Sequence, residues 1–429
     1  MITNRRIGDP RGATGRIVAL CDCDNFFVSC ERRFHPSLKK CPVVVLSSND
    51  GCIISRSNEV KAMGIPMGTP YFKVKPLLER KGVAVLSGDI GKYVFVSREV
   101  MHTLSAFSDT VEAYSIDEAF LNLSLAPLKD PVDYASKIRQ AVRERVGIPI
   151  SVGIAGTRTL SKIAASLAKK RASGVFLISE DQDRLPILEA TPVEDVWGIG
   201  RKSAELLKRF GVKTAADLTR KDPEWIRRKT SIRGVMIARE LQGFPCHSMI
   251  SRNGPPQSIQ DSRTFGHKLH SLEALEKPVL EHALRVGTRL RKAHMAAGSL
   301  TVYVRSGDEY GKYRHLSRET TFDPPVCSDH ALIQGALLAL REIFVPGCVY
   351  TKAGVCLKCL SDVTYRQTRL FDDERDTRER KKLETLSRTL DTLNRRMGKK
   401  TIYPAVLVDK DRAWQPRKDH SFETGTQKT

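Results

Sequence analysis

The residues with the clearest potential chemistry are carboxylates at the ends of apolar segments. Asp117 and Glu118 separate two β-prone runs, residues 110–114 and 119–123. Side chains alternate between the two faces of a strand, so neighbouring carboxylates can serve one site only where the chain bends, as in a turn between paired strands. Asp22 ends a second apolar run, which is typical of a buried strand. We therefore expect a turn and a strand end that both present carboxylate oxygens.

If Asp22 lies beside Asp117 and Glu118, the three carboxylates need a cation. Two such charges repel each other by about 4 kcal/mol at ~4 Å when the effective dielectric constant is about 20. Carboxylate oxygens favour Mg²⁺ or Mn²⁺ over Zn²⁺, and the usual Cys and His pattern of a zinc site is missing at these positions. The alternative is that the two segments are unrelated acidic turns exposed to solvent.

Composition indicates a globular protein with an anionic partner. The chain has 429 residues, of which 41% are apolar, enough for several cores in about two to four domains. Its formal net charge of +22 comes from 71 Lys and Arg against 49 Asp and Glu, which indicates a polyanion and most simply nucleic acid. No apolar run is long enough to span a bilayer, and the polar first 16 residues lack the apolar core of a signal peptide. We expect a cytoplasmic protein with no membrane partner.

The ten cysteines lie mostly in apolar segments, as reduced thiols of cytosolic proteins do. Cys356 and Cys359 form a Cys-x-x-Cys within a run that is typical of a strand. Zinc would need further ligands, for which Cys348 and Cys327 are the candidates. A zinc site there is the less favoured alternative.

Periodicity predicts the elements that must position the carboxylates. Apolar residues recur at helical spacing over residues 91–107 and 131–146. A strand precedes Asp22, and one strand lies on each side of Asp117 and Glu118. The order strand, helix, paired strands, helix, strand is the split βαβ pattern of a ferredoxin-like sheet, with the acidic residues at the ends of its central strands. A further helix at 159–170 carries Lys162 and Lys169, which by themselves indicate no more than a solvated face.

Shorter helical segments begin near Thr191. Two of them are joined by Val196 and Trp197 followed by Gly198, Ile199, Gly200, Arg201 and Lys202. This pattern is typical of a helix-hairpin-helix, in which glycines let the backbone approach a phosphate and the next helix offers free N–H groups at its N-terminus. A plain glycine turn between packed helices is the alternative.

A linker rich in Pro and Gly at residues 243–260 precedes a second α+β domain. We expect a basic helix at 278–297, a strand at 299–305, a helix at 331–344 and a strand at 352–360. The basic face of this domain suits contact with a nucleic-acid backbone.

The tail contains an apolar pair within a polar stretch. Leu370 and Phe371 follow Gln367, and leucines at heptad spacing then form a helix that ends near Gly398. Such a pair suits docking into a partner's pocket, although ordinary packing is the alternative.

Together these residues resemble the Y-family translesion DNA polymerases, in particular the UmuC type of bacterial SOS mutagenesis. The resemblance extends from about Ile17 to the tail. It rests on Cys21 and Asp22 with Phe26 and Phe27, on Asn49, Asp50, Gly51 and Cys52, on Tyr114 to Phe120, on Leu160 to Lys169, and on Gly198, Ile199 and Gly200.

The resemblance implies an α+β multidomain fold, a right-hand polymerase with a ferredoxin-like palm, small fingers, a helical thumb with a helix-hairpin-helix, and an α+β little-finger domain. The implied boundaries are an N-terminal extension at 1–16, palm at 17–31 and 91–180, fingers at 32–90, thumb at 181–245, linker at 246–260, little finger at 261–362, and a C-terminal tail at 363–429 with a clamp-binding motif and an amphipathic helix.

The activity that the resemblance implies is template-directed, error-prone DNA synthesis past lesions. Asp22, Asp117 and Glu118 would be the catalytic residues and would bind two Mg²⁺ ions, or Mn²⁺, with help from the Cys23 backbone carbonyl. One ion would lower the pKa of the primer 3′-OH, and the other would hold the triphosphate of the dNTP and neutralise the leaving pyrophosphate.

Five residues fall at positions that contact the incoming nucleotide in this family: Phe26, Phe27, Asn58, Lys61 and Lys169. Phe27 would be the steric gate, a flat ring that clashes with a 2′-OH and admits deoxynucleotides. The chain differs from the family here, because UmuC tends to have Tyr at the gate and many members have Tyr in place of Asn58.

The implied partners are primer-template DNA, dNTPs, the sliding clamp (beta), a UmuD-type accessory dimer and the RecA filament. The hairpin at Gly198, Ile199, Gly200, Arg201 and Lys202 would bind DNA, and Gln367, Leu370 and Phe371 would bind the clamp. Two other classes of protein share parts of this pattern. A catalytically inactive DNA-binding scaffold would not need the carboxylates, and a nucleotide cyclase, which can also use a ferredoxin-like palm with two metals, would not need the thumb or the little finger.

Overall fold

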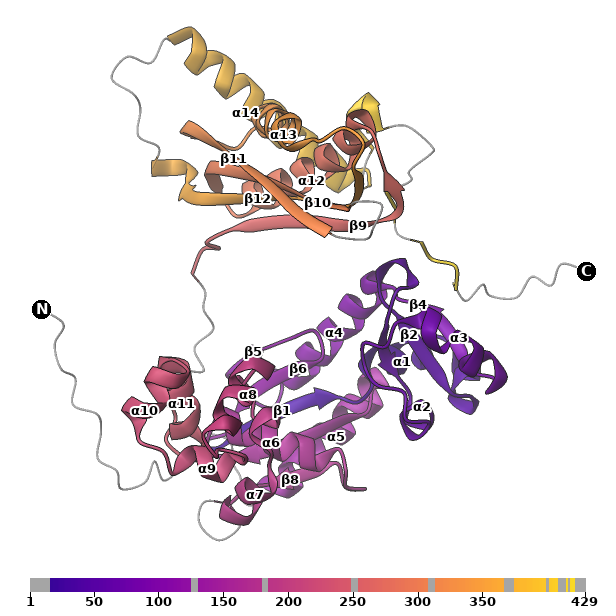
Figure 1. Cartoon of the computed structure of the whole chain (residues 1–429), viewed down its shortest axis with the longest axis vertical. Helices are drawn as coiled ribbons and strands as arrows, with labels where there is room; N and C mark the ends of the chain where they lie inside the picture. Colours follow the sequence, from indigo (N-terminus) through magenta and orange to yellow (C-terminus); the bar gives the residue numbers. More distant parts are fainter. Residues whose placement is uncertain are drawn as a thin grey trace, which may run out of the picture. The chain divides into compact units, whose positions relative to one another are not determined.

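The computed structural model divides the chain into two compact units, which are described separately (Figure 1). Unit 1 comprises the described residues up to 47 together with 51–247, and unit 2 comprises 48–50 together with 254–420. The structure describes residues 16–124, 130–179, 184–247, 254–307, 313–365, 374–398, 401–407, 414–415 and 417–420, except the side chains of 365 and 374–376. Within these ranges no helix is both long and apolar enough to cross a membrane.

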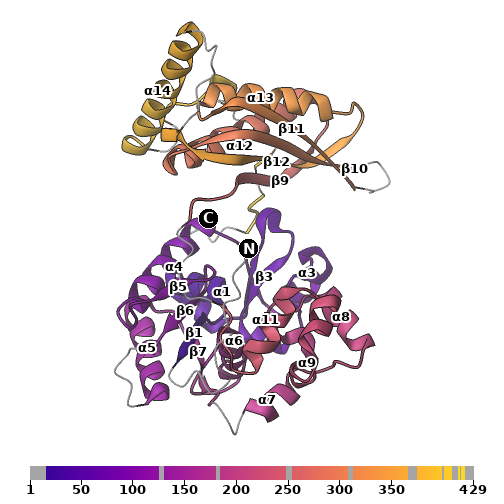
Figure 2. The same ribbon diagram turned by 90° about the vertical axis from the view of Figure 1, so that its left-hand side faces the viewer.

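Unit 1 contains two sheets and the helices that cover them (Figures 1 and 2). Its elements, in chain order, are β1 (Val18–Cys23), α1 (Phe26–Phe34), β2 (Val43–Leu46), β3 (Ile53–Arg56), α2 (Asn58–Ala62), α3 (Tyr71–Arg80), β4 (Ala84–Ser87), α4 (Ile90–Leu104), β5 (Val111–Ala113), β6 (Glu118–Asn122), α5 (Pro131–Val146), β7 (Ile150–Ala155), α6 (Arg158–Ala168), β8 (Val175–Leu177), α7 (Arg184–Ala190), α8 (Arg201–Arg209), α9 (Ala215–Thr219), α10 (Pro223–Lys229) and α11 (Ile232–Leu241).

The larger sheet has the strand order β5-β6-β1-β7-β8. Strand β1 runs antiparallel to both β6 and β7, and β8 extends the sheet by pairing in parallel with β7. The first four strands of this order are those of a split βαβ sheet, so the predicted ferredoxin-like topology is confirmed.

Alternation along β1 divides its side chains between two layers of helices. Ala19 and Cys21 belong to the core that α4 and α5 complete, whereas Leu20 packs with Phe120 of β6 and Ala165 of α6. An acidic residue two positions beyond Leu20, or two positions before Phe120, must therefore face the α6 side of the sheet.

Helix α6 lies directly against the sheet because β7 contains a glycine. A methyl group at Gly153 would overlap the backbone nitrogen of Ala165 and lie 2.5 Å from the carbonyl oxygen of Ser161. Since backbone atoms cannot move aside as a flexible side chain can, only glycine permits this close approach.

The smaller sheet of unit 1 has the order β3-β2-β4, with β2 parallel to β4 and antiparallel to β3. Its core joins the sheet to Val60 of α2 and Leu78 of α3. Helices α7 to α11 form a third core around Leu207 and Leu218, which also includes Leu160 and Ile163 of α6.

Unit 2 is a four-stranded antiparallel sheet with the order β11-β10-β12-β9, packed against two helices. Its elements are β9 (Ile259–Leu269), α12 (Leu272–Lys292), β10 (Met295–Gly307), β11 (Tyr313–Val326), α13 (Asp329–Ile343), β12 (Val349–Asp362) and α14 (Glu374–Arg396).

The predicted bounds were right for some elements and wrong for others. The structure has α5 and β7 where the sequence predicts them, at 131–146 and 150–155. The helix predicted at 278–297 instead begins at Leu272, includes Pro278 and ends at Lys292. Strands β9 and β11 were not predicted at all.

Replacing Gly153 by Ala tests the close packing of α6. We expect a loss of about 1–3 kcal/mol in the free energy of unfolding, because the added methyl group must push α6 away from β7. Urea denaturation followed by circular dichroism measures this loss. Gly254→Ala is the matched control, since no atom lies within 4 Å of the added methyl group at that position, and equal stability of both variants would contradict the argument.

Candidate active site

Asp22 and Glu118 lie next to each other at the ends of two interior strands of the larger sheet. These two residues are register partners on β1 and β6. Asp117 immediately precedes β6 in a tight turn, and its carbonyl oxygen accepts a hydrogen bond of 2.9 Å from the Cys23 backbone N–H. The oxygen Oδ1 of Asp117 accepts a hydrogen bond of 2.5 Å from the Ser115 hydroxyl. The expected proximity of Asp22 to the acidic turn is thus present in the structure.

Two lysines of the α6 segment pair with these carboxylates. The Lys162 ammonium nitrogen lies 2.7 Å from Glu118 Oε2, and that of Lys169, the residue after the end of the helix, lies 2.7 Å from Asp22 Oδ1. The lysines are seven residues apart, about two helical turns, so both extend from one face of the helix. Because Asp22 and Glu118 face α6, the alternation of the strands and the period of the helix bring the four charges together.

Burial makes the negative charge of Asp22 costly in the absence of a metal ion. Desolvation raises the pKa of Asp22 to about 7, against the opposing effect of Lys169 and with added repulsion from Glu118 and Asp117. Burial acts to lower the pKa of Lys169, but the Asp22 carboxylate outweighs it and raises the pKa overall. A further cation near Asp22 would favour its ionised form.

The donor set fits a hard divalent cation. Asp22, Asp117 and Glu118 offer only oxygen atoms, and the charges they bring together need neutralising. In the described part of the chain no three His, Cys, Asp or Glu side chains are arranged as a ligand set, and lysines pair with two of these carboxylates. A metal ion at these carboxylates would compete with the two ammonium groups for their oxygens.

Phe27 lies in the first turn of α1, four residues after the end of β1. Its ring stacks on that of Tyr93, with ring centroids 4.6 Å apart, and Tyr93 is fixed by a hydrogen bond of 2.7 Å from its hydroxyl to Glu31. Phe26 is a core residue with 4% of its surface exposed, whereas Phe27 is only partly buried. The two neighbouring rings therefore have different surroundings, and Phe27 is the one with an accessible face.

The residues at the other predicted nucleotide positions belong to α2 and its surroundings. The Asn58 side-chain oxygen accepts a hydrogen bond of 3.0 Å from the Asn25 amide. Burial and the positive charges of Lys169 and Arg56 lower the pKa of Lys61. The nitrogens Nε and Nη1 of Arg56 are buried without a hydrogen-bond partner in the described structure. Cationic groups thus gather where an anionic ligand would relieve their repulsion.

The predicted hairpin provides an open helix N-terminus. Gly198 has φ +91°, a left-handed conformation that favours glycine, and Gly200 precedes the first turn of α8 with open space around it. The side chain of Arg201 is 88% exposed. The segment before the hairpin is a 3-10 helix, Val193–Asp195, rather than the α-helix of a regular pair.

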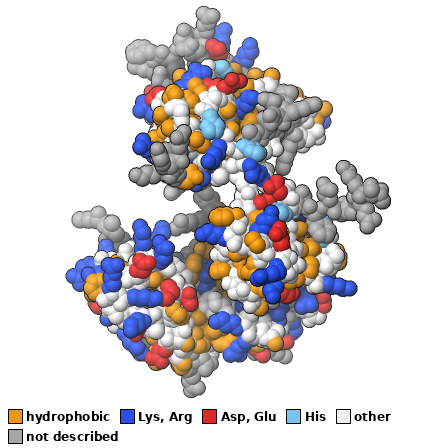
Figure 3. Space-filling view, turned by 45° about the vertical axis from the view of Figure 1, so that its right-hand side comes forward, with side chains coloured by type: hydrophobic (Ala, Val, Ile, Leu, Met, Phe, Trp, Pro, Cys, Tyr) orange, Lys and Arg blue, Asp and Glu red, His pale blue; other side chains and the backbone are white. Residues whose placement is uncertain are grey.

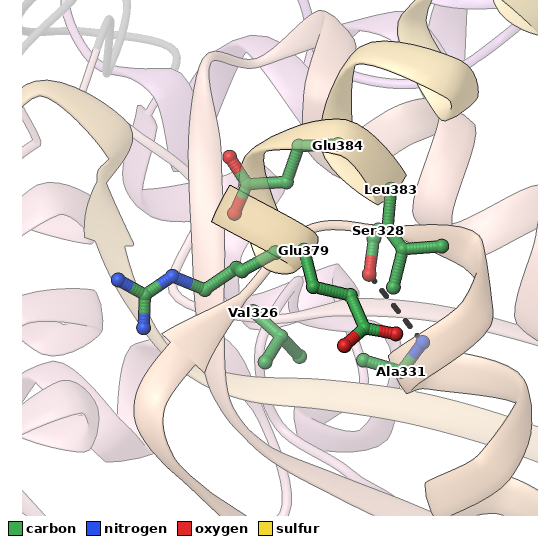
Figure 4. Close-up of a pocket in the computed structure, with 7 residues that line it drawn as sticks. Val326, Ser328, Ala331, Glu379, Leu383 and Glu384 are labelled. Atoms are coloured by element: carbon green, nitrogen blue, oxygen red, sulfur yellow. Dashed lines mark hydrogen bonds between the residues drawn. The ribbon is translucent and has the colours of Figure 1, made fainter. Parts of the chain in front are cut away.

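Within unit 2, the tail helix α14 packs on α12 and α13. Arg291 is buried between Asp329 and Asp391, at 2.8 and 2.6 Å, and the Ser387 hydroxyl accepts a hydrogen bond from the Asp329 backbone N–H. A cavity of about 220 Å³ lies beside this contact, and Figure 4 shows the side chains that line it. The lining residues are Val326, Ser328, Ala331, Glu379, Arg380, Leu383 and Glu384. Gln367, Leu370 and Phe371 lie outside the described residues.

Sequence reasoning missed the site roles of Lys162 and Arg56. Lys162 looked like part of a solvated helix face, yet only 18% of its side chain is exposed. The signal that could have identified it is the seven-residue spacing to Lys169, which places both ammonium groups on one face of the helix. For Arg56 we find no comparable signal in the sequence.

Comparisons with known proteins give consistent matches along the chain. The impB/mucB/samB family matches residues 21–166, its C-terminal domain matches 256–370, and the HHH motif of the IMS family matches 181–212. Protein UmuC of Salmonella typhimurium is 37% identical over 90% of this chain and 92% of its own length. DNA polymerase IV of Desulfatibacillum aliphaticivorans is 28% identical over 92% of this chain and 98% of its own.

A solved structure has the same fold. It is a Y-family DNA polymerase chimera of Dbh and Dpo4, with a TM-score of 0.66 and 22% identity, and the alignment covers 81% of this chain and 99% of the chimera. At this identity the likeness concerns the fold, which agrees with the multidomain α+β architecture predicted from the sequence.

Proposed function

The chain belongs to the impB/mucB/samB family as a UmuC-type Y-family DNA polymerase, and from this premise we propose that it performs error-prone synthesis past template lesions in SOS mutagenesis. The observation that carries the proposal is the position of Asp22, Asp117 and Glu118 at the ends of the central strands of the ferredoxin-like sheet, beside the two lysines of the α6 segment. A DNA-binding scaffold would have no use for three carboxylates whose mutual repulsion must be compensated.

We assign the parts of the polymerase from the elements that form them. The larger sheet with α1, α4, α5 and α6 is the palm, the smaller sheet with α2 and α3 is the fingers, and α7 to α11 are the thumb. Within unit 2, β9 to β12 with α12 and α13 are the little finger, and α14 belongs to the tail.

The acidic residues would hold two Mg²⁺ or Mn²⁺ ions. When bound, these ions supply a lower pKa for the primer 3′-OH and charge neutralisation for the leaving pyrophosphate. Asp22 and Glu118 extend toward α6 from adjacent strands, and the tight turn holds Asp117 at the same end of these strands. The Cys23 carbonyl would add an oxygen ligand from the end of β1.

The cations around α2 and the end of α6 would orient the triphosphate. Lys169 and Arg56 repel the charge of Lys61, and two nitrogens of Arg56 have no hydrogen-bond partner in the described structure, so a triphosphate would stabilise all three cations. Asn58 stands at the start of α2 as a neutral contact. Phe27 would support the sugar, because its stacking on Tyr93 prevents the ring from turning away from a 2′-OH.

The hairpin and the basic surface would bind the DNA backbone. Backbone N–H groups at the start of α8 are free to meet a phosphate, and Arg201 and Lys202 extend from the same turn. Figure 3 shows Lys and Arg side chains spread over the surface in this view, in keeping with the net charge of +22.

The tail and the accessory partners complete the proposal. Gln367, Leu370 and Phe371 would bind the sliding clamp, and the likeness to a UmuC protein supports a UmuD-type dimer and the RecA filament as further partners.

Asp117→Asn separates a polymerase from a scaffold. We expect primer extension with dNTPs and Mg²⁺ to fall below detection, because one of the oxygen ligands loses its charge, while binding to primed DNA measured by fluorescence anisotropy is unchanged or tighter. Asp133→Asn on α5, whose exposed carboxylate pairs with Lys137 at 2.8 Å, is the matched control and should extend normally. Undiminished extension by Asp117→Asn would refute the proposed catalytic role.

Phe27→Ala tests the steric gate. Removing the ring should increase the incorporation of ribonucleotides relative to deoxynucleotides by roughly 10- to 200-fold, the range expected when a pocket loses one close steric contact. Single-nucleotide insertion kinetics with dCTP and CTP measure the ratio. Phe27→Tyr retains the ring and should retain the discrimination, and an unchanged ratio in Phe27→Ala would show that another residue excludes the 2′-OH.

Replacing both Leu370 and Phe371 by Ala tests the clamp contact. The expected result is shorter products on a clamp-loaded template, with little change on the same template without the clamp, because only docking of the tail is lost. Leu386→Ala, which removes an exposed leucine of α14, is the control. An equal loss with and without the clamp would mean that the pair stabilises the fold instead.

A further inference from the structure

Lys162 contacts two aromatic rings in addition to its carboxylate partner. Besides its ion pair with Glu118, its ammonium nitrogen lies 4.7 Å from the centre of the Tyr114 ring and 5.6 Å from the centre of the Trp197 ring. Tyr114 belongs to the acidic turn, whereas Trp197 directly precedes the first glycine of the hairpin. One ammonium group thus contacts a proposed metal ligand and the proposed DNA-binding hairpin.

The indole of Trp197 is fixed against the palm by several contacts. Its N–H donates a hydrogen bond of 3.1 Å to the Tyr114 hydroxyl, and the two rings meet edge to face with their centroids 5.5 Å apart. The Arg158 guanidinium lies 5.8 Å from the indole centre and 4.2 Å from the centre of the Phe120 ring. Arg158 is in turn held by Glu112 at 2.9 Å. A shift of the hairpin would therefore move the surface on which Lys162 rests.

The surroundings of Lys162 give its charge two alternative partners. An ammonium over an aromatic face is attracted by the ring, more strongly where water is largely excluded, and only 18% of each side chain of the Lys162–Glu118 pair is exposed. If Glu118 turns to a divalent cation, Lys162 loses its carboxylate but can still rest on Tyr114 and Trp197. The lysine need not leave the site when its partner changes.

We propose that Lys162 is a positioning residue that couples the position of the Trp197 hairpin to the carboxylate of Glu118. Before a cation binds, Lys162 contacts Glu118 and both rings, and when Glu118 binds the cation the lysine keeps only the contacts with the rings. A DNA phosphate on the hairpin and a divalent cation at the carboxylates then affect each other through this one side chain. The inference rests on the proposed metal-binding role of Glu118.

Fluorine NMR of the full chain labelled with 5-fluorotryptophan tests the coupling. The chain contains three tryptophans, Trp197, Trp225 and Trp414, and each resonance is assigned by a Trp→Phe replacement. Ca²⁺ added to the metal-free protein serves as an oxygen-seeking, non-catalytic probe, and calorimetry records its binding. We expect a saturable shift of the Trp197 resonance, because Glu118 would no longer neutralise the Lys162 charge beside the indole ring. The Trp225 and Trp414 resonances should be unchanged.

Substitutions of Lys162 identify the side chain responsible. In Lys162→Met, Ca²⁺ should still bind, but the shift of the Trp197 resonance should be lost. Lys162→Arg keeps the charge and should restore the shift. Lys170→Met, which removes an exposed lysine just after α6, is the matched control and should behave as the unsubstituted chain.

The possible failures are distinguishable. Calorimetric Ca²⁺ binding without a shift of the Trp197 resonance, or an equal shift in Lys162→Met, would refute the coupling and leave the metal site intact. Absence of Ca²⁺ binding would refute the metal site and the coupling with it. If Lys162→Met does not fold by circular dichroism, the Lys162→Arg variant and the response of the unsubstituted chain decide the question.

Discussion

The repulsion among three carboxylates at the ends of neighbouring strands is the constraint on which the site depends. Asp22 and Glu118 lie opposite each other on neighbouring strands, and Asp117 lies next to Glu118 in the turn. The structure compensates this charge with ammonium groups from α6, which must therefore pack close to the sheet. Gly153 permits this packing, so a residue with no side chain helps to determine how the charged ones meet.

The start of α6 is fixed by a second buried carboxylate. Glu240 of α11 is fully buried and accepts hydrogen bonds from the N–H and the hydroxyl of Thr159, at 2.9 and 2.7 Å. Its other oxygen accepts hydrogen bonds from the backbone N–H groups of Cys246 and His247. A carboxylate at a helix N-terminus is favoured by the helix dipole and by the free N–H groups there. Helix α6 thereby joins the strand ends that carry the carboxylates to the helical region that carries the hairpin.

The sequence predicts elements whose pattern is local and misses contacts that depend on packing. Alternation and apolar runs identified the acidic turn and the last residues of β1, because carboxylates that interrupt an apolar run mark the region where a buried strand nears its end. Strand β1 itself includes Asp22 and ends at Cys23. Strand β11 was missed because its residues are mostly exposed and polar, and it pairs only with β10 at the edge of the sheet. The start of α12 was placed too late, at Pro278, because the cap at Ser271 was not recognised. Ser271 caps the true N-terminus through a hydrogen bond from the Ala274 N–H to its side-chain oxygen.

Lys162 shows why the chemistry of a site is harder to predict than its ligands. Carboxylates at strand ends are unusual enough to stand out, whereas a lysine on a helix is ordinary until the facing surface is known. Here that surface is Glu118 with the rings of Tyr114 and Trp197, which come from the turn and from a segment about 80 residues further along the chain. Burying an ion pair with so little exposure costs free energy of desolvation that the attraction between its charges must offset, so exchanging its cation changes the surroundings of every group that touches it. The aromatic faces provide Lys162 with a second resting place, which makes such an exchange possible without exposing the lysine to an uncompensated apolar environment.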